Sequence, residues 1–351
     1  MLPWFQFNYS AIDIDSIVKL RVKYGNIPIH ATKFNGGALW VDKNIAVFVM
    51  EGLSNSVRLW SSKNIPNNSY FFFTNQMFPY SLQEIKNQID FFHEVTSGRF
   101  DNTRLIHMAN DTQSLEHCIK LGLVNSFFCN QNCWIDFDIF KITRDVKYKR
   151  FDFVINLRPE LIKRPFLAQK VKKLCVIQGA LYRQDEYFDL QSLNPDYINK
   201  SRITQVEVND LLNQSYAGGI FSEKEGACFA SSEYLLAGIP VVSTKSTGGR
   251  DYWYNENNSI IVEPTPEAVF EGVRIAKEKL IIGDFSSVEI RNQHVKESIR
   301  LRKKFIEKLG YLFALHGILH DPEVIVHAYC NHGSFFKSKP YPNYRLNADI
   351  N

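Results

Sequence analysis

The stretch 222–243 constrains the fold of this chain more than any other part of it. Closely spaced acids and small residues open the stretch, and a helical pattern follows that ends at Gly238. Pro240 then leads directly into the apolar pair Val241 and Val242. A continuous apolar run is typical of a strand that is covered on both faces, as in a parallel sheet. The stretch therefore predicts a turn, a helix and a buried parallel strand, in that order.

Two carboxylates, Glu225 and Glu233, lie eight positions apart around this turn and the start of the helix. Backbone N–H groups at a helix N-terminus bind anions, and a carboxylate further along accepts hydrogen bonds from vicinal hydroxyls. A Gly-rich loop, Thr247-Gly248-Gly249, follows the strand. Taken alone, Glu233 would be explained as an exposed acid that the helix dipole favours. Together these residues predict a site for a phosphate and a polyol, which is the chemistry of a nucleotide sugar.

Short apolar runs alternate with polar, helix-like stretches along the chain. The expected strands are 45–50, 70–74, 104–108, 126–129, 151–156, 173–178, 218–222, 240–243 and 260–263. The expected helices are 81–93, 111–121, 209–215, 233–237 and 265–280, and 203–207 is expected to be a strand or a loop. Ser81 and Glu84 form a capping-box pattern at the first of these helices. The alternation predicts an α/β protein with mostly parallel sheets.

A charged, poorly periodic segment at 141–150 separates two patterned halves, and we interpret it as a linker. A chain of 351 residues is long enough for two domains of ordinary size. We predict a first domain over 1–145, a second domain over 146–330 and a C-terminal tail over 331–351.

Two cations, Arg158 and Lys163, follow the first expected strand of the second half. Open α/β sheets bind ligands at the carboxyl ends of their strands, and two cations at this edge would neutralise a diphosphate. The alternative is a solvated basic loop. The downstream glutamates favour the diphosphate interpretation, because a leaving nucleoside diphosphate builds negative charge that fixed cations stabilise.

Composition restricts the partners and the compartment. The formal net charge of +4 fits an anionic ligand or a lipid surface but gives no indication of nucleic-acid binding. The six cysteines have no zinc-ligand spacing and indicate buried thiols of a reducing compartment. Neither a secretory signal nor a membrane span is recognisable, which predicts a cytoplasmic protein. The basic run 291–308 is compatible with peripheral membrane contact at the inner face and equally with a solvated helix face.

The second half resembles the donor domain of GT-B glycosyltransferases, specifically the large retaining group-1 family with the Glu-x7-Glu motif. The matches are Arg158 and Lys163, the run from Glu225-Gly226 to Glu233, and Gly238-Ile239-Pro240-Val241-Val242 with Gly248-Gly249 downstream. Tyr234 departs from the pattern, because the family usually has a small residue after the second glutamate. The resemblance implies two Rossmann-like domains whose parallel sheets face each other across a cleft. It also implies that the N-terminal domain over 1–145 binds the acceptor and that the domain over 146–330 binds the nucleotide-sugar donor.

The resemblance also implies roles for the matched residues. Arg158 and Lys163 would hold the donor diphosphate, Glu225 would face the transferred sugar, and Glu233 would accept hydrogen bonds from the ribose. The donor loops would consist of Gly226, Ala227, Cys228, Thr247, Gly248 and Gly249. The resemblance implies no bound metal and no other cofactor, with the nucleotide sugar as co-substrate.

The implied reaction transfers a sugar from a nucleotide diphosphate sugar to a hydroxyl of a glycan or lipid-linked glycan, with retention of configuration. The expected acceptor would be part of a surface polysaccharide, so the expected role is polysaccharide biosynthesis. Two alternatives stay open: a nucleotide-sugar epimerase or hydrolase on the same fold, and a non-catalytic sugar-binding protein.

The first half departs from the family pattern. Gly36-Gly37 comes late for a phosphate loop and precedes no clear helix. His107, in an expected strand, and Asn75, at the end of another, are candidate contacts for the acceptor. A histidine buried in the core is the alternative for His107.

Overall fold

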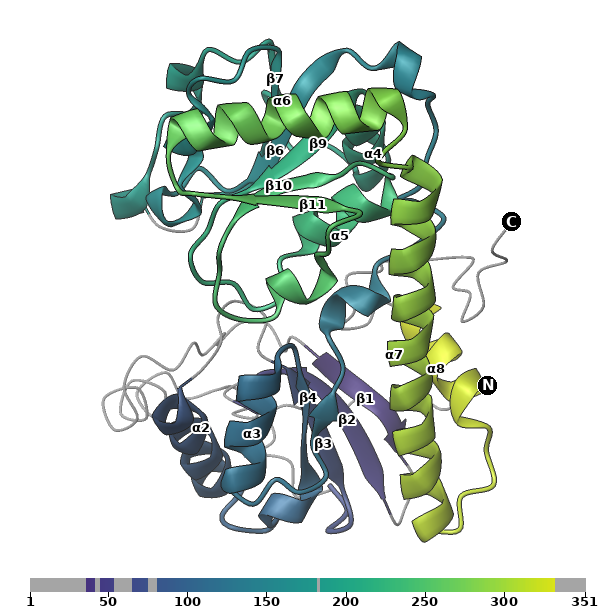
Figure 1. Ribbon diagram of the computed structural model, residues 1–351. Helices are drawn as coiled ribbons and strands as arrows, with labels where there is room; N and C mark the ends of the chain where they lie inside the picture. Colours follow the sequence, from purple (N-terminus) through teal and green to yellow (C-terminus); the bar gives the residue numbers. More distant parts are fainter. Residues whose placement is uncertain (1–35, 42–44, 54–64, 75–80, 182–183, 332–351) are drawn as a thin grey trace. The chain divides into compact units, whose positions relative to one another are not determined.

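The structure is a computed structural model that describes residues 36–41, 45–53, 65–74, 81–181 and 184–331. The described residues form two compact α/β units (Figure 1). Unit 1 contains the described residues up to Trp134 and those from Leu301 onward, and unit 2 contains Ile135–Arg300. The long helix α7 (Ser287–Leu315) contributes residues to both units.

This grouping differs from the predicted domain limits at two places. Residues 135–145, predicted for the first domain, belong to unit 2, and residues 301–330, predicted for the second domain, belong to unit 1. The charged segment that we interpreted as a linker contacts helix α4 (Gln205–Asn213) of unit 2. The amides of Lys141 and Thr143 donate to the side-chain oxygens of Asn209 and Asn213, at 3.1 and 2.7 Å. Contacts between residues so far apart in the sequence leave no local signal.

The sheet of unit 1 contains strands β1 to β5 in chain order. They are β1 (Gly36–Val41), β2 (Ala46–Glu51), β3 (Tyr70–Thr74), β4 (Leu105–Ala109) and β5 (Phe127–Phe128). Strand β1 is antiparallel to β2, and the remaining pairs are parallel. The expected parallel strands are confirmed within one or two residues, whereas β1, which contains Gly36-Gly37, was not expected.

Side chains of β3 alternate between the two faces of this sheet, as the period of two requires. Phe71 contacts Phe92 of helix α2 (Leu82–Val95), and Phe72 contacts Phe305 of α7. Both phenylalanines are fully buried, which explains why apolar side chains occupy consecutive positions in this strand. Helix α3 (Thr112–Lys120) packs on β4 and β5, and α8 (Pro322–Asn331) packs on β1. The predicted capping box of Ser81 and Glu84 is confirmed at α2.

The sheet of unit 2 is parallel throughout, in the order β11-β10-β9-β6-β7-β8. Its strands are β6 (Phe151–Leu157), β7 (Leu174–Gln178), β8 (Tyr197–Ile198), β9 (Ser215–Ile220), β10 (Val241–Thr244) and β11 (Ser259–Val262). Because the strands are parallel, all of their carboxyl ends lie at one edge, and β6, β9 and β10 are neighbours there.

Helices α5 (Phe229–Leu236) and α6 (Pro266–Ile282) lie on opposite faces of this sheet (Figure 1). Thr265 caps α6 and Pro266 is its first residue, as predicted. The prediction for 203–207 was wrong, because Thr204 caps α4 and forms a capping box with Glu207. Among the described residues, no helix is both long enough and apolar enough to cross a membrane.

Candidate active site

The candidate site lies at the carboxyl edge of the unit-2 sheet, where the loops after β6, β9 and β10 meet. Lys163 ends a short 3-10 turn after β6 (Leu161–Lys163), and Glu225 lies in the loop after β9. The Lys163 ammonium forms an ion pair with Glu225 Oε1, and both side chains are largely buried. The Ser222 hydroxyl donates to the same oxygen at 2.5 Å. The structure thus brings together two residues that lie 62 positions apart.

The second predicted cation, Arg158, is paired with an acid that the sequence analysis did not identify. Its guanidinium lies 3.1 Å from Glu160 Oε2, and the Glu160 side chain has no exposed surface. The Arg158 side chain retains 18% exposure. A buried carboxylate requires such a partner, so Glu160 holds the guanidinium while part of the Arg158 side chain stays accessible.

Glu233 lies in helix α5 and is buried, with a relative exposure of 2%. Its Oε2 accepts a hydrogen bond from the Asn156 side-chain amide at 3.0 Å. The alternative of an exposed acid at the helix start is therefore wrong. Asn156 lies in β6, two residues before Arg158, and no sequence signal pointed to it.

Tyr234, the departure from the family pattern, is fully buried and fills space that a glycine leaves open. A Cβ atom on Gly218 of β9 would lie 2.4 Å from the Tyr234 ring, so glycine is required opposite this tyrosine. The Tyr234 hydroxyl accepts from the backbone N–H of Asn156 at 2.7 Å and donates to the Gly219 carbonyl at 3.3 Å. The large residue thereby anchors the strand that carries Asn156.

The loops after β9 and β10 run alongside each other. The Glu225 amide donates to the Thr247 carbonyl at 3.0 Å, and the Gly249 amide donates to the Gly226 carbonyl at 2.6 Å. Gly248 has a φ of +106°, a conformation that favours glycine. The predicted donor loops, Gly226 to Cys228 and Thr247 to Gly249, are therefore adjacent.

Cys228 adopts a left-handed conformation (φ +55°) immediately before α5, and Ala227 is fully buried. Burial, and secondarily the Glu225 carboxylate, raise the pKa of the Cys228 thiol to about 12. The thiol is therefore neutral near pH 7 and adds no charge to the loop.

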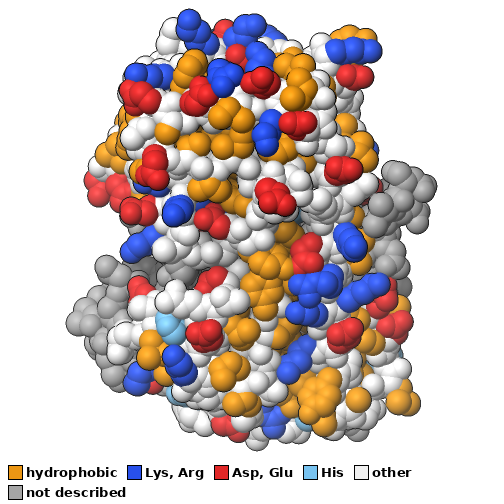
Figure 2. Space-filling view, in the orientation of Figure 1, with side chains coloured by type: hydrophobic (Ala, Val, Ile, Leu, Met, Phe, Trp, Pro, Cys, Tyr) orange, Lys and Arg blue, Asp and Glu red, His pale blue; other side chains and the backbone are white. Residues whose placement is uncertain are grey.

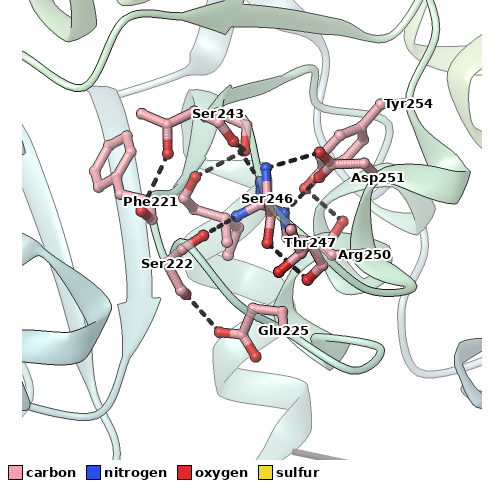
Figure 3. A network of polar contacts seen from close by, with 12 residues as sticks. Phe221, Ser222, Glu225, Ser243, Ser246, Thr247, Arg250, Asp251 and Tyr254 are labelled. Carbon is pink, nitrogen blue, oxygen red and sulfur yellow. Dashed lines mark hydrogen bonds and ion pairs between the residues drawn. The ribbon is translucent and has the colours of Figure 1, made fainter. Parts of the chain in front are cut away.

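Two arginines that the sequence analysis missed join the ends of β9 and β10. Arg164 donates to the Phe221 carbonyl at 2.5 Å and to the Thr244 hydroxyl at 2.8 Å. Arg250 is fully buried and donates to the Ser222 carbonyl at 2.9 Å (Figure 3). In the sequence, these two arginines are marked only by their places beside Lys163 and Gly249, in the predicted site loops.

In unit 1, His107 is buried in the core. Its ring stacks on Phe73 with centroids 4.8 Å apart, and its Nδ1 lies 3.2 Å from Cys118 Sγ. Burial lowers the pKa of His107 to about 3, so the ring is neutral. The structure favours the buried-core alternative over contact with an acceptor. Asn75 lies outside the described residues.

Side-chain amides gather at the carboxyl edge of the unit-1 sheet. The Asn110 side-chain nitrogen donates to the Thr74 hydroxyl at 3.3 Å, and Asn110 Oδ1 accepts from the backbone N–H of Gln131 at 2.8 Å. The Asn130 side chain donates to the Asn110 carbonyl at 3.1 Å. These four residues are buried.

The basic run in α7 is not a uniform basic face. Arg302 is 1% exposed and donates to the Cys133 carbonyl at 2.6 Å. Arg291 donates to the carbonyls of Leu236 and Phe137 at 2.7 and 2.8 Å. Basic and acidic side chains are intermixed over most of the face in Figure 2. Membrane contact and the absence of nucleic-acid binding stay predictions.

Among the residues that the structure describes, no group of three or more His, Cys, Asp or Glu side chains is placed to hold a metal ion. The prediction that the reaction proceeds without a bound metal or other cofactor stays untested.

No protein-family model matches the chain, and no curated protein sequence matches it. Solved structures do match. HepE from Anabaena, in complex with UDP-glucose, has a TM-score of 0.54 at 14% identity, over 76% of this chain and 78% of HepE. Sucrose-phosphate synthase from Thermosynechococcus elongatus has a TM-score of 0.52 at 11% identity, over 78% and 74% of the two chains.

A mutant of TarM from S. aureus, in complex with Fondaparinux, alpha-GlcNAc-glycerol and UDP, has a TM-score of 0.55 at 13% identity. The match covers 76% of this chain but 55% of TarM, so this chain spans about half of TarM. At these identities the likeness shows the fold. The predicted α/β class and GT-B fold are confirmed. That the two sheets face each other across a cleft stays a prediction.

Proposed function

We propose that this chain is a glycosyltransferase that moves a sugar from a nucleotide diphosphate sugar to an acceptor hydroxyl. The observation that carries the proposal is the convergence of Lys163, Glu225 and Glu233 at the edge of the unit-2 sheet. Open α/β sheets bind ligands at this edge. The GT-B fold supports the proposal, because HepE and TarM, which share it, were solved with UDP-glucose and with UDP.

Lys163 has two roles in this proposal. Without a ligand it neutralises the buried carboxylate of Glu225. When the donor binds, its ammonium turns to the diphosphate, where it stabilises the charge that builds up as the bond to the sugar breaks. Arg158, held by Glu160, supplies the second cation.

Glu225 and Glu233 bind the uncharged parts of the donor. Glu225 accepts from hydroxyls of the sugar once Lys163 has turned away, and Ser222 keeps its carboxylate in place. Glu233 accepts from the ribose hydroxyls, with its orientation set by Asn156. Glu233 is therefore a binding residue, and Glu225 and Lys163 are close to the reacting bond.

The finer assignments follow from the resemblance. Retention of anomeric configuration rests on the likeness of Arg158, Lys163, Glu225 and Glu233 to the retaining group-1 family. A UDP-sugar is the favoured donor class because of the ligands of HepE and TarM. A glycan or lipid-linked glycan is the proposed acceptor, and a cytoplasmic site of action is part of the same proposal.

The first experiment identifies the donor and then measures its turnover. UDP-, GDP-, ADP- and CMP-sugars are screened by thermal shift on the full chain, since a ligand of the native state raises its melting temperature. Release of nucleoside diphosphate is then measured with and without glycan acceptors, and NMR of the product gives its anomeric configuration.

Each outcome of this experiment has a defined meaning. Acceptor-dependent release with a new glycosidic product supports transfer. Release without an acceptor product would indicate a hydrolase, and conversion of the donor itself would indicate an epimerase. Binding without any turnover would overturn the proposal and favour a sugar-binding protein.

A further inference from the structure

Arg250 carries a buried positive charge beside the site but has no exposed surface of its own. Its Nε donates to Asp251 Oδ1 at 2.7 Å, and its two terminal nitrogens donate to the carbonyls of Ser222 and Thr244. A buried charge persists where it is paired and hydrogen-bonded. The guanidinium therefore ties together the two chain segments that leave β9 and β10.

Ser222 connects this clamp to the site. Its carbonyl accepts from Arg250, and its hydroxyl donates to Glu225 Oε1 (Figure 3). The same carboxylate oxygen pairs with Lys163. A shift of the Ser222 backbone would therefore move the hydroxyl that orients the Glu225 carboxylate. The Asp251 carboxylate adds a second tie, because its Oδ2 accepts from the Ser246 amide at 3.1 Å.

We propose that Arg250 is a positioning residue for sugar transfer: it fixes Ser222, and through the Ser222 hydroxyl it sets the Glu225 carboxylate. The inference rests on the proposed function. Arg250 does not touch the donor, because its side chain is fully buried. Loss of the clamp therefore lowers kcat more than it weakens donor binding, because Glu233 and the two cations after β6 still bind the ribose and the diphosphate.

The test is a double-mutant cycle on the full chain with Arg250→Lys, Ser222→Ala and the double variant. Lysine keeps the charge but loses the planar fork that reaches three acceptors at once. We expect each single variant to lower kcat about tenfold or more, with the donor KM changed less than about threefold. Because both residues act on Glu225 by one route, the double variant is about as slow as the slower single variant.

Arg302→Lys is the matched control. Arg302 is also fully buried and donates to a backbone carbonyl, that of Cys133, but it belongs to unit 1. We expect this variant to lower thermal stability without changing kcat per folded molecule. If Arg250→Lys fails to fold, Asp251→Asn replaces it in the cycle, because it weakens the acceptor of the Arg250 Nε by removing its charge.

The outcomes separate this inference from the proposed function. No turnover by the wild-type chain overturns the proposed function and the inference with it. If the wild type turns over the donor and the fold losses in kcat of the two single variants multiply in the double variant, the inference alone is overturned, because Arg250 and Ser222 then act independently. A rise in donor KM at constant kcat in Arg250→Lys also overturns it.

Discussion

Both sheets place the carboxyl ends of neighbouring parallel strands at one edge, but the two edges carry different chemistry. At the unit-2 edge the loops carry charged groups in pairs, Lys163 with Glu225 and Arg158 with Glu160. At the unit-1 edge the buried polar groups among the described residues are neutral, and Asn110 is the centre of their hydrogen bonds. A parallel sheet places loop residues at one edge in both cases, and the side chains decide which ligand suits that edge.

Under the proposed function, the two edges would bind different substrates. A diphosphate requires cations, and these are found among the described residues at the unit-2 edge. Uncharged hydroxyls need no such cations, and at the unit-1 edge the buried amides of Asn110 and Asn130 would hold the loops around an acceptor rather than contact it. The proposal that donor binding belongs to unit 2 and acceptor recognition to unit 1 is therefore open to test by substitutions at each edge.

The largest effect is expected from Lys163→Ala. Loss of its charge at a site screened from water removes about 3 kcal/mol of transition-state stabilisation, or roughly a hundredfold in kcat. Steady-state kinetics of donor turnover measures this. The matched control is Lys170→Ala, in the same unit, because Lys170 is 49% exposed and pairs with Glu267 at the surface. Wild-type turnover by Lys163→Ala would exclude its role.

Glu233→Gln is expected to weaken donor binding with little change in kcat. A hydrogen bond to a charged group contributes about 1.5–3 kcal/mol, so the donor Kd rises roughly tenfold or more. Calorimetric titration with the nucleoside diphosphate measures the loss. An unchanged Kd, or a loss confined to kcat, would contradict the assignment of Glu233 to the ribose.

His107 makes the stability of unit 1 sensitive to acid. Burial lowers the pKa of folded His107 to about 3. The free energy of unfolding is therefore highest above pH 6.5 and falls as the pH is lowered, because the unfolded chain binds a proton that the folded chain does not. Between pH 7 and pH 5 the loss is about 2 kcal/mol. In His107→Phe, the free energy of unfolding measured with denaturant should differ between pH 7 and pH 5 by about 2 kcal/mol less than in the wild type. An unchanged pH dependence would show that His107 has the same pKa in the folded state as in the unfolded chain, against the burial argument.

Asn110→Ala is expected to have the smallest effect and to act on the acceptor side. Asn110 is buried, so its substitution acts through the loops that it holds. Each internal hydrogen bond that it removes is worth about 1 kcal/mol, and we expect the resulting loop shift to raise the acceptor KM about fivefold while the donor Kd stays constant. Kinetics at varied acceptor concentration, with donor titration as the control, distinguishes the two. If Asn110→Ala raised the donor Kd by the same factor, the assignment of the acceptor to the unit-1 edge and of the donor to the unit-2 edge would be wrong.

Local patterns in the sequence were sufficient for much of the fold. The continuous apolar run at 70–74 predicted β3, because a strand covered on both faces has no polar side. Thr265 and Pro266 predicted the start of α6. In contrast, the capping box of Thr204 and Glu207 was present in the sequence and was overlooked.

The site was predictable where a motif carried it and not where contacts cross the sheet. The spacing of Glu225 and Glu233 pointed to both acids. Asn156 and Glu233 are 77 positions apart, so their contact depends on strand order, which no local pattern reveals. The return of residues from Leu301 onward to unit 1 is a long-range feature of the same kind.

The most direct test of the central claim compares nucleoside diphosphate binding to the wild-type chain, Lys163→Ala and Glu225→Gln by calorimetry. If Lys163 exchanges from Glu225 to the diphosphate, Glu225→Gln binds at least as tightly as the wild type, because a competing negative charge is removed. The same variant transfers sugar far more slowly, and Lys163→Ala binds more weakly. Equal losses of binding in Glu225→Gln and Lys163→Ala would contradict the exchange and the charged-edge account built on it.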